Sequence, residues 1–172
     1  MNTVLSNLSD TDKAYLAGLF DGEGCINACI NTKKYFPKTR RKFCFHAWVK
    51  LQFVISNKDH LLLEKGVKTI VGFGGIYREG DIYDWRVTKR EQLLSVFNAL
   101  IPHVKLKKKA LQVAKDAVLF LLQRRYRQRW TKDELIFLHE KFVLPLQKLL
   151  PSGEKRGRPP KYTFQEILSN LC

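Results

Sequence analysis

The sequence predicts an α+β domain in which helices cover one face of an antiparallel sheet, with the element order αββαββα and extra helices at the C-terminal end. Three observations support this class. Two long stretches alternate apolar and polar residues, two short strands flank a Gly-Asp turn, and helical periodicity fills the segments around them. Strands with one polar face indicate a sheet that is covered on its other side only.

The first helix is expected over about residues 10–21, because Ser9 or Asp10 can cap its start and two glycines follow its end. Residues 25–33 and 43–56 alternate between apolar and polar side chains, which is typical of half-buried strands. The turn between them is basic and contains a proline. These two strands therefore predict a long hairpin.

A second helix is expected over residues 58–71, with Ser56 or Asn57 as its cap and a glycine-rich turn after it. Two short strands follow at residues 75–79 and 82–88, joined by a Gly-Asp pair of the kind that tight hairpins favour. The sequence thus predicts a second hairpin.

Further helices are expected in the second half of the chain. One opens at Thr88 and runs to about residue 101, and residues 106–128 form a long basic amphipathic helix. Another covers residues 131–149, where Pro145 kinks or ends it. After a linker rich in Pro, Gly and basic residues, a last short helix is expected near the C-terminus.

We expect one domain over residues 1–150 and a basic tail with a short helix over residues 151–172. The chain has 31 Lys and Arg against 16 Asp and Glu, a net charge of +15, which calls for a polyanionic partner.

Its longest apolar run is far shorter than the ~20 residues of a membrane span, and no secretory signal or transit peptide is recognisable. The cysteines form no CxxC pair, so thiols in a reducing compartment are expected, and a zinc site at Cys44 and His46 is set aside.

The segment LAGLFDGEG, residues 16–24, places two carboxylates at a helix end. The C-terminal end of a helix carries partial negative charge, so Asp21 and Glu23 cost roughly 0.3–1 kcal/mol each there and require a positive group nearby. Carboxylate, carbonyl and water oxygens are the ligands that Mg²⁺ prefers. The segment is therefore a candidate metal site that a substrate phosphate would complete, although two acids after a helix are more often a solvated turn.

Three small residues, Ala14, Gly18 and Gly22, recur every four positions and form one stripe on this helix. Another backbone can approach such a stripe closely. Tight packing in the protein's own core is the commoner cause of such a stripe. The alternative is contact with the same helix of a second copy, which would bring two acidic helix ends together near a two-fold axis.

LAGLFDGEG resembles the signature of the LAGLIDADG homing endonucleases at nearly every position. The element order, the basic stretch KLKKK and the chain length are similar to the single-motif, homodimeric branch of that family, and the resemblance covers about residues 8–150. It implies a sheet that forms a DNA-binding saddle, and a homodimer that acts on double-stranded DNA and on no small molecule or membrane. It also implies an organellar location, in a chloroplast or mitochondrion, as an intron product.

The activity implied by the resemblance is a double-strand break in a long, roughly palindromic target, the intronless allele. The cofactor would be Mg²⁺, for which Mn²⁺ or Ca²⁺ can substitute in binding. In the family, the last acid of the motif and the carbonyl of the preceding glycine hold the metal, which implies Glu23 and Gly22 here. Asp21 is expected to support the helix end, with contact to metal or water as the alternative.

A polar residue at the end of the second strand and a lysine beyond the second hairpin position the hydrolytic water in such enzymes. Asn57 and Lys107 occupy these places. Asn57 can equally be a simple helix cap. The rivals of Lys107 are Lys105, Lys108 and Lys109, and the whole cluster can also serve as a phosphate-binding patch.

Base recognition is expected from the polar faces of the two hairpins, acting as β-ribbons in the major groove. The candidates in the first hairpin are Asn27, Asn31, Lys33, Trp48, Lys50 and Gln52. Those in the second are Tyr77, Glu79, Asp84 and Arg86, alternating with Ile76, Ile82, Tyr83 and Trp85. The basic loop of the first hairpin is expected to contact phosphates through Lys38, Arg40, Arg41 and Lys42.

Near the C-terminus, KRGRPPK resembles the core of an AT-hook, which implies insertion into the minor groove of A/T-rich DNA; a charged linker is the alternative.

Three other functions compete with the nuclease: an RNA maturase that assists group I intron splicing, a non-cleaving DNA-binding protein and, more distantly, a structural ribosomal protein. The presence of Glu23 and the lysine cluster favours the nuclease. The sequence contains no GxSxG, HExxH or P-loop motif.

Overall fold

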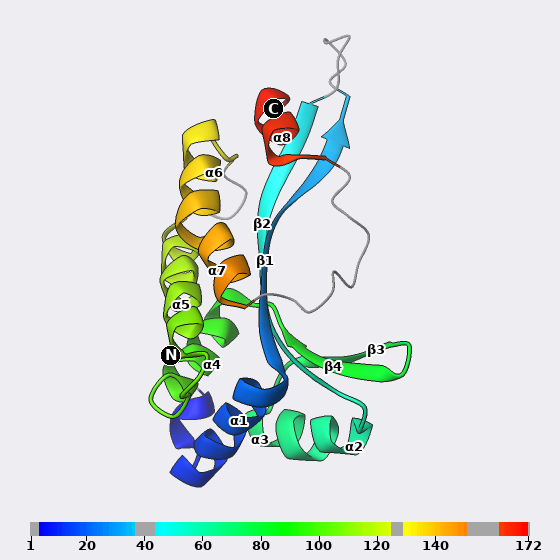
Figure 1. Ribbon diagram of the computed structural model, residues 1–172, viewed down its shortest axis with the longest axis vertical. Coiled ribbons are helices and arrows are strands. Elements are labelled where there is room, and N and C mark those ends of the chain that lie inside the picture. Colours follow the sequence, from blue (N-terminus) through cyan, green and yellow to red (C-terminus); the bar gives the residue numbers. More distant parts are fainter. Residues whose placement is uncertain (1–3, 37–43, 125–128, 151–161, 172) are drawn as a thin grey trace.

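The computed structural model describes residues 4–36, 44–124, 129–150 and 162–171. It contains a four-stranded antiparallel sheet with strand order β1-β2-β4-β3. Helices lie on one side of this sheet, and the β3–β4 hairpin projects away from α4 to α7, with α2 and α3 beneath it (Figure 1). The predicted fold class and the order αββαββα are therefore confirmed.

The helices and strands of the structure have the following bounds. The helices of the described residues are η1 (Val4–Asn7), α1 (Asp10–Glu23), α2 (His60–Leu63), α3 (Thr69–Val71), α4 (Arg90–Leu100), α5 (Lys108–Gln123), α6 (Lys132–Leu138), α7 (Leu144–Leu149) and α8 (Phe164–Ser169). Two π-helical segments are η2 (Glu64–Lys68) and η3 (His139–Val143), and the strands are β1 (Gly24–Tyr35), β2 (Cys44–Asn57), β3 (Gly75–Glu79) and β4 (Ile82–Val87). None of the helices described is long and apolar enough to cross a membrane.

Helix α1 leads directly into β1, because a glycine at the junction permits a close turn. Ser9 caps the start of the helix by accepting a hydrogen bond from the backbone of Asp12, as predicted. At the other end the Gly24 N–H donates to the carbonyl of Phe20. A Cβ on Gly24 would overlap the Phe20 ring and lie 2.7 Å from that carbonyl oxygen. The motif therefore ends where the sheet begins.

The strand register assigns the side chains to two faces. Gly24 pairs with Ile55 and Ile26 with Phe53, so the apolar residues of β1 and β2 face the helices together. Trp85, on β4, pairs with Ile55 and is 1% exposed, which puts it on the same face. Polar residues at alternate positions therefore share the opposite, open face. The β3–β4 turn lies at Gly80 and Asp81, as predicted, with Gly80 at a φ of 63°.

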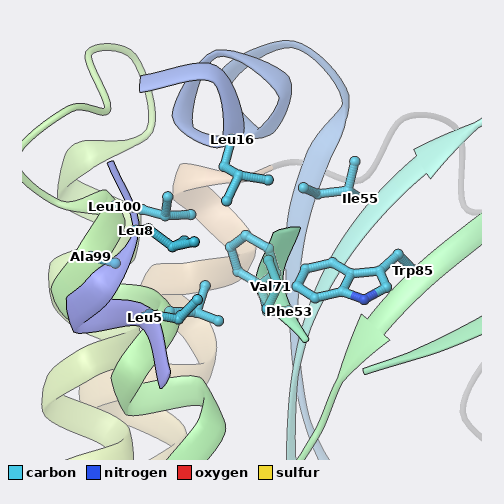
Figure 2. A pocket seen from close by; sticks show the side chains of 10 residues that line it. Leu5, Leu8, Leu16, Phe53, Ile55, Val71, Trp85, Ala99 and Leu100 are labelled. Atoms are coloured by element: carbon cyan, nitrogen blue, oxygen red, sulfur yellow. The ribbon is translucent and has the colours of Figure 1, made fainter. Parts of the chain in front are cut away.

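The core beneath α1 is apolar and closely packed. Leu5, Leu16 and Leu100 converge from the helices on Phe53 and Trp85 of the sheet (Figure 2). The cavity among them measures about 10 Å³, which is too small for a ligand. This packing fixes α1 against the sheet on one side and leaves the opposite side of the helix to the surroundings.

The helix predicted over residues 58–71 is broken in two by η2. Its cap is Asp59, which accepts hydrogen bonds from two backbone N–H groups, and not Ser56 or Asn57, which still lie in β2. The Thr69 hydroxyl and backbone N–H both reach the Glu64 carbonyl, five residues back, and so stabilise the wider turn. Sequence periodicity over so short a segment does not reveal this change of pitch.

Three other helix boundaries differ from the prediction. Helix α4 begins at Arg90 and not at Thr88. Helix α5 ends at Gln123, because Arg124 turns into an extended conformation and lies 3.4 Å from the centre of the Trp130 ring. The predicted break at Pro145 is accommodated by the π-helical segment η3 before it, since proline has no N–H to donate to the preceding turn.

The C-terminal helix α8 packs against the far end of the first hairpin, on the helix side of the sheet. The Phe45 N–H donates to the Asn170 carbonyl, and the Phe45 ring contacts Tyr162. Phe164 stacks on His139 with ring centres 3.9 Å apart.

The expectation of free thiols is wrong for Cys44, which is disulfide-bonded to a partner outside the described residues. The spacing of cysteines along a sequence does not show which of them lie close together in the fold. The thiols of Cys25 and Cys29 are free.

Candidate active site

The C-terminal end of α1 combines a free carboxylate with a lysine ammonium. Glu23 is exposed, and its carboxylate forms no hydrogen bond or ion pair with any described residue. The Nζ of Lys107 donates to the carbonyls of Phe20 and Gly24, at 2.9 and 2.7 Å. The ammonium thus lies at the negative end of the helix and supplies the positive charge that the two acids require. The other lysines of the cluster, Lys105, Lys108 and Lys109, are exposed.

Asp21 binds the segment that carries Lys107. Its Oδ2 accepts from the backbone N–H of Lys105 at 2.8 Å and of Leu106 at 3.2 Å, and its Oδ1 accepts from the backbone N–H of Lys107 at 3.0 Å. Burial tends to raise the pKa of Asp21, but these three hydrogen bonds and the Lys107 charge outweigh it, so the pKa is lowered. Both carboxylate oxygens are therefore engaged in holding the loop before α5.

The position of Lys107 affects its protonation. Partial burial lowers the pKa of Lys107, and the nearby charges of Asp21 and Glu23 reduce this shift without cancelling it. The group therefore gives up its proton more readily than an ordinary lysine does. Asp21 and Lys107 form a reciprocal contact, which we call the helix-end clamp: Asp21 holds the backbone of the lysine, and the lysine side chain returns to the end of α1.

The oxygen donors at this site fit a hard divalent cation only in part. One protomer offers the Glu23 carboxylate and the backbone carbonyl of Gly22, both at exposed positions. In the described residues, no group of three or more His, Cys, Asp or Glu side chains could enclose a metal. The remaining ligands would have to be water or oxygens of a bound substrate, which suits a cation that retains several waters.

Asn57 lies at the end of β2, at the same end of the sheet as Glu23. It follows Ile55 by two positions, and Ile55 pairs with Gly24. The Asn57 Oδ1 accepts a hydrogen bond of 2.8 Å from the backbone of Asp59. The side chain therefore helps to form the turn into α2, which is the local role that competes with the catalytic one.

The open face of the first hairpin carries all six predicted base-reading residues. Across the two strands Asn27 pairs with Gln52, and Asn31 pairs with Trp48. Lys50 and Lys33 lie on the same face, on either side of the Asn31–Trp48 pair. Gln52 is only 5% exposed, whereas Trp48 is 45% exposed, so Trp48 is the more accessible of the two to a ligand.

The four candidates of the second hairpin lie on the open face and contact one another. Tyr77 pairs with Asp84, and Glu79 and Arg86 lie at alternate positions of the same strands. Arg86 donates to Asp84 and to Glu79, and its guanidinium lies over the Tyr77 ring, 5.1 Å from the ring centre. Ile82 pairs with Glu79 and so shares their face, which corrects its assignment to the opposite one.

Some residues on the open face are not among the predicted base-reading candidates. His46 pairs with Lys33, and Cys29 pairs with Lys50. The alternation of the strands would have identified both, since each has the same phase as its predicted neighbours. The predicted phosphate contacts Lys38, Arg40, Arg41 and Lys42, and the KRGRPPK segment, lie outside the described residues.

The small-residue stripe of α1 does not pack in the protein's own core. Ala14, Gly18 and Gly22 are all exposed. A Cβ added to Gly18 or Gly22 meets no described atom within 4 Å, so the fold of one protomer does not require glycine at either position. Glycine inside a helix costs roughly 0.5–1 kcal/mol relative to alanine, and nothing within the described protomer offsets that cost.

Comparison with known proteins agrees with the motif and the fold. The model of the LAGLIDADG endonuclease family matches residues 16–117, more than half of the chain. No curated protein matches the sequence. The structure is similar to the archaeal intron-encoded homing endonuclease I-Vdi141I complexed with DNA, at 20% identity over 93% of this chain and 94% of that one, with a TM-score of 0.67.

Two further solved structures share the fold. The homing endonuclease I-CvuI, in complex with its target in the presence of Ca, has 18% identity over 94% of this chain and 92% of that one, with a TM-score of 0.66. The group I intron-encoded homing endonuclease I-CeuI, complexed with DNA, has 15% identity over 95% of this chain and 77% of that one, with a TM-score of 0.64. With the motif at the start of the matched region, the chain belongs to the LAGLIDADG endonuclease family, whose members are DNA endonucleases.

Proposed function

We propose that two copies of this chain, joined along α1, form a site-specific endonuclease that makes a double-strand break in a long, roughly palindromic DNA target, the intronless allele of a host gene. The observation that carries this proposal is the free Glu23 carboxylate beside the Lys107 ammonium, at the helix end that opens onto the sheet. A carboxylate and a cation at this place suit the hydrolysis of a phosphodiester.

The exposed stripe of α1 supports the homodimer. Gly18 and Gly22 cost the isolated helix stability, and they leave room for a second backbone at a close distance. Contact between two copies of this helix would bring two Glu23 carboxylates near the two-fold axis. Each carboxylate would then serve one strand of the duplex, which explains how a chain with a single motif could cut both strands.

The chemistry assigns a distinct task to each residue at the helix end. A divalent cation held by Glu23 and the Gly22 carbonyl would supply a Lewis acid for the phosphate. The Lys107 ammonium stabilises negative charge that develops on the phosphate or on the leaving 3′ oxygen. Asn57 orients the attacking water, and Asp21 holds Lys107 in place without touching the substrate. No side chain of the protein acts as a nucleophile.

The whole molecule supports duplex DNA as the substrate. The net charge of +15 favours binding to a polyanion. The open sheet face presents amide, aromatic and cationic side chains on two adjacent β-ribbons, and such ribbons fit the major groove. Three relatives of the same fold, I-Vdi141I, I-CvuI and I-CeuI, were determined in complex with DNA or with their target, and Mg or Ca was present in the complexes of I-CvuI.

The test is a cleavage selection from a randomised DNA library with Mg²⁺, followed by cleavage of the selected site by Glu23→Gln. The wild type should select a long site with two related halves. Glu23→Gln should bind that site yet lose at least ~10²-fold in cleavage, because the carboxylate is essential for the metal. Lys107→Met should lose activity in the same way, whereas Lys109→Met, which alters an exposed lysine in the first turn of α5, should remain active.

Other outcomes would contradict parts or all of this proposal. Cleavage that Glu23→Gln leaves intact would contradict the assigned site. Selection of a binding site with no cleavage by the wild type in Mg²⁺, Mn²⁺ or Ca²⁺ would indicate a DNA-binding protein. Enhanced splicing of a cognate intron without any DNA cleavage would indicate a maturase.

A further inference from the structure

A cluster on the open face of the second hairpin holds one arginine in a defined orientation. Asp84 and Arg86 flank Trp85, whose side chain is in the core, so both point to the open face. Arg86 lies opposite Gly75 on β3. A Cβ on Gly75 would lie 2.9 Å from the Tyr77 ring, so the missing side chain allows that ring to lean beside Arg86.

The two carboxylates hold different parts of the guanidinium. Asp84 Oδ2 accepts from Arg86 Nε at 3.3 Å and from Nη2 at 2.7 Å. Glu79 Oε1 accepts a second hydrogen bond from Nη2. Within the described residues, Nη1 donates to no acceptor. Asp84 thus holds the side of the guanidinium formed by Nε and one N–H of Nη2, while the end formed by Nη1 and the other N–H of Nη2 is contacted only by Glu79 among the described residues.

Solvent exposure distinguishes the two carboxylates further. The Asp84 side chain is 13% exposed and the Arg86 side chain 20%, so their contact is sheltered. The Glu79 side chain is 65% exposed and lies near the tip of the hairpin. Glu79 can therefore leave Arg86 at little cost, whereas Asp84 stays in place when a ligand approaches.

We propose that Arg86 reads a guanine base in the major groove, that Asp84 is its positioning residue, and that Glu79 occupies the base-binding end of the arginine until DNA displaces it. This proposal rests on the proposed function and names the base that one residue of the saddle recognises. Guanine presents two adjacent acceptors, O6 and N7, to an arginine end of this geometry. Adenine presents an acceptor beside a donor and does not match.

Charge argues against a phosphate as the ligand of Arg86. One guanidinium and two carboxylates give the cluster a net charge of −1, which repels a phosphate group. The major-groove edge of a guanine is uncharged, and its acceptors O6 and N7 face the N–H donors at the end of the guanidinium. Arg78 on the same hairpin differs, because it lies on the other face and stacks near Tyr83, 5.8 Å from the ring centre. Arg78 is therefore a matched control.

The experiment compares base preferences from library selections with the wild type, Arg86→Ala, Arg86→Lys, Asp84→Asn, Glu79→Gln and Arg78→Ala, after circular dichroism has confirmed that each variant is folded. The wild type should show a G·C pair at one position of each half-site, preferred by about 10- to 100-fold. Arg86→Ala should abolish the preference at that position alone, and Arg86→Lys should weaken it. Arg78→Ala should leave it unchanged.

The carboxylate variants separate positioning from simple charge effects. Asp84→Asn should reduce the preference at the same position and leave the others intact. Glu79→Gln should tighten binding to all sequences and keep the guanine preference, because the competing acceptor loses its charge. A uniform loss of affinity in Arg86→Ala, with an unchanged base profile, would show a phosphate contact and overturn this inference while leaving the nuclease in place. A wild type that selects no DNA sequence would refute both.

Discussion

Two acids of one motif, Asp21 and Glu23, lie two positions apart in opposite environments. Asp21 accepts three backbone hydrogen bonds from the segment before α5, and Glu23 is free and exposed. The first acid therefore stabilises the protein, and the second is available for a ligand. The sequence located both acids and the need for a cation, but it could not distinguish their tasks, because the partner segment is more than eighty residues away.

The helix-end clamp predicts a pH-dependent stability. Asp21→Asn should lower the free energy of unfolding at pH 7 by about 1–3 kcal/mol, because the amide replaces one acceptor oxygen by a donor that faces a backbone N–H. The pKa of Asp21 is lowered in the folded state from a usual value of 3.8, so its contribution is complete above that value and disappears as the pH falls through the lower, folded pKa. Chemical denaturation at pH 7 and below pH 4 measures this.

The difference in stability between the wild type and Asp21→Asn should therefore be constant near neutral pH and shrink in acid. Asp81→Asn is the matched control, since Asp81 is an exposed residue of a hairpin turn, where asparagine is equally acceptable. Equal stabilities of the wild type and Asp21→Asn at pH 7 would refute the clamp.

At the scale of elements, α1 has a buried side and an exposed side, and both carry information about its contacts. One side packs Leu16 and Phe20 into the core, and the other exposes Ala14, Gly18 and Gly22. An amphipathic helix of a monomer would place long polar residues on its outer side. In the proposed dimer, this exposed side packs against α1 of the second copy.

Gly18→Leu tests this reading of the helix. The variant protomer should stay folded and gain up to about 1 kcal/mol of helix stability, because leucine replaces glycine in open space. It should, however, lose the dimer and with it double-strand cleavage. Sedimentation velocity measures the assembly. Gln112→Leu, at an exposed position of α5, should remain dimeric, and a dimeric, active Gly18→Leu would show that another surface joins the copies.

The elements also show where sequence patterns suffice and where they fail. The strands and the Gly80–Asp81 turn follow from alternation and glycine chemistry, because these signals are local. The π-helical segments change the pitch within a helix, and the early end of α5 accompanies the stacking of Arg124 on Trp130. Periodicity cannot report either feature. The predicted open face was correct for every base-reading candidate, whereas their mutual contacts required the register.

At the scale of the whole molecule, the proposed enzyme is a symmetric dimer of which this chain is one half. One protomer supplies one Glu23, one Lys107 and one open sheet face. Two faces side by side would read the two halves of a target, and two helix ends would each serve one DNA strand. The net charge of +15 on each copy favours the approach to DNA but does not select a sequence.

The most direct test uses mixed dimers in which only one copy carries Glu23→Gln, purified through two different affinity tags and given a supercoiled plasmid that contains the selected site and Mg²⁺. If each copy cuts one strand, the mixed dimer should convert the plasmid to the nicked, open-circular form and stop there. The wild-type dimer should give the linear form, and the doubly substituted dimer should give neither. Linear product from the mixed dimer at the wild-type rate would contradict the assignment of one Glu23 to each strand.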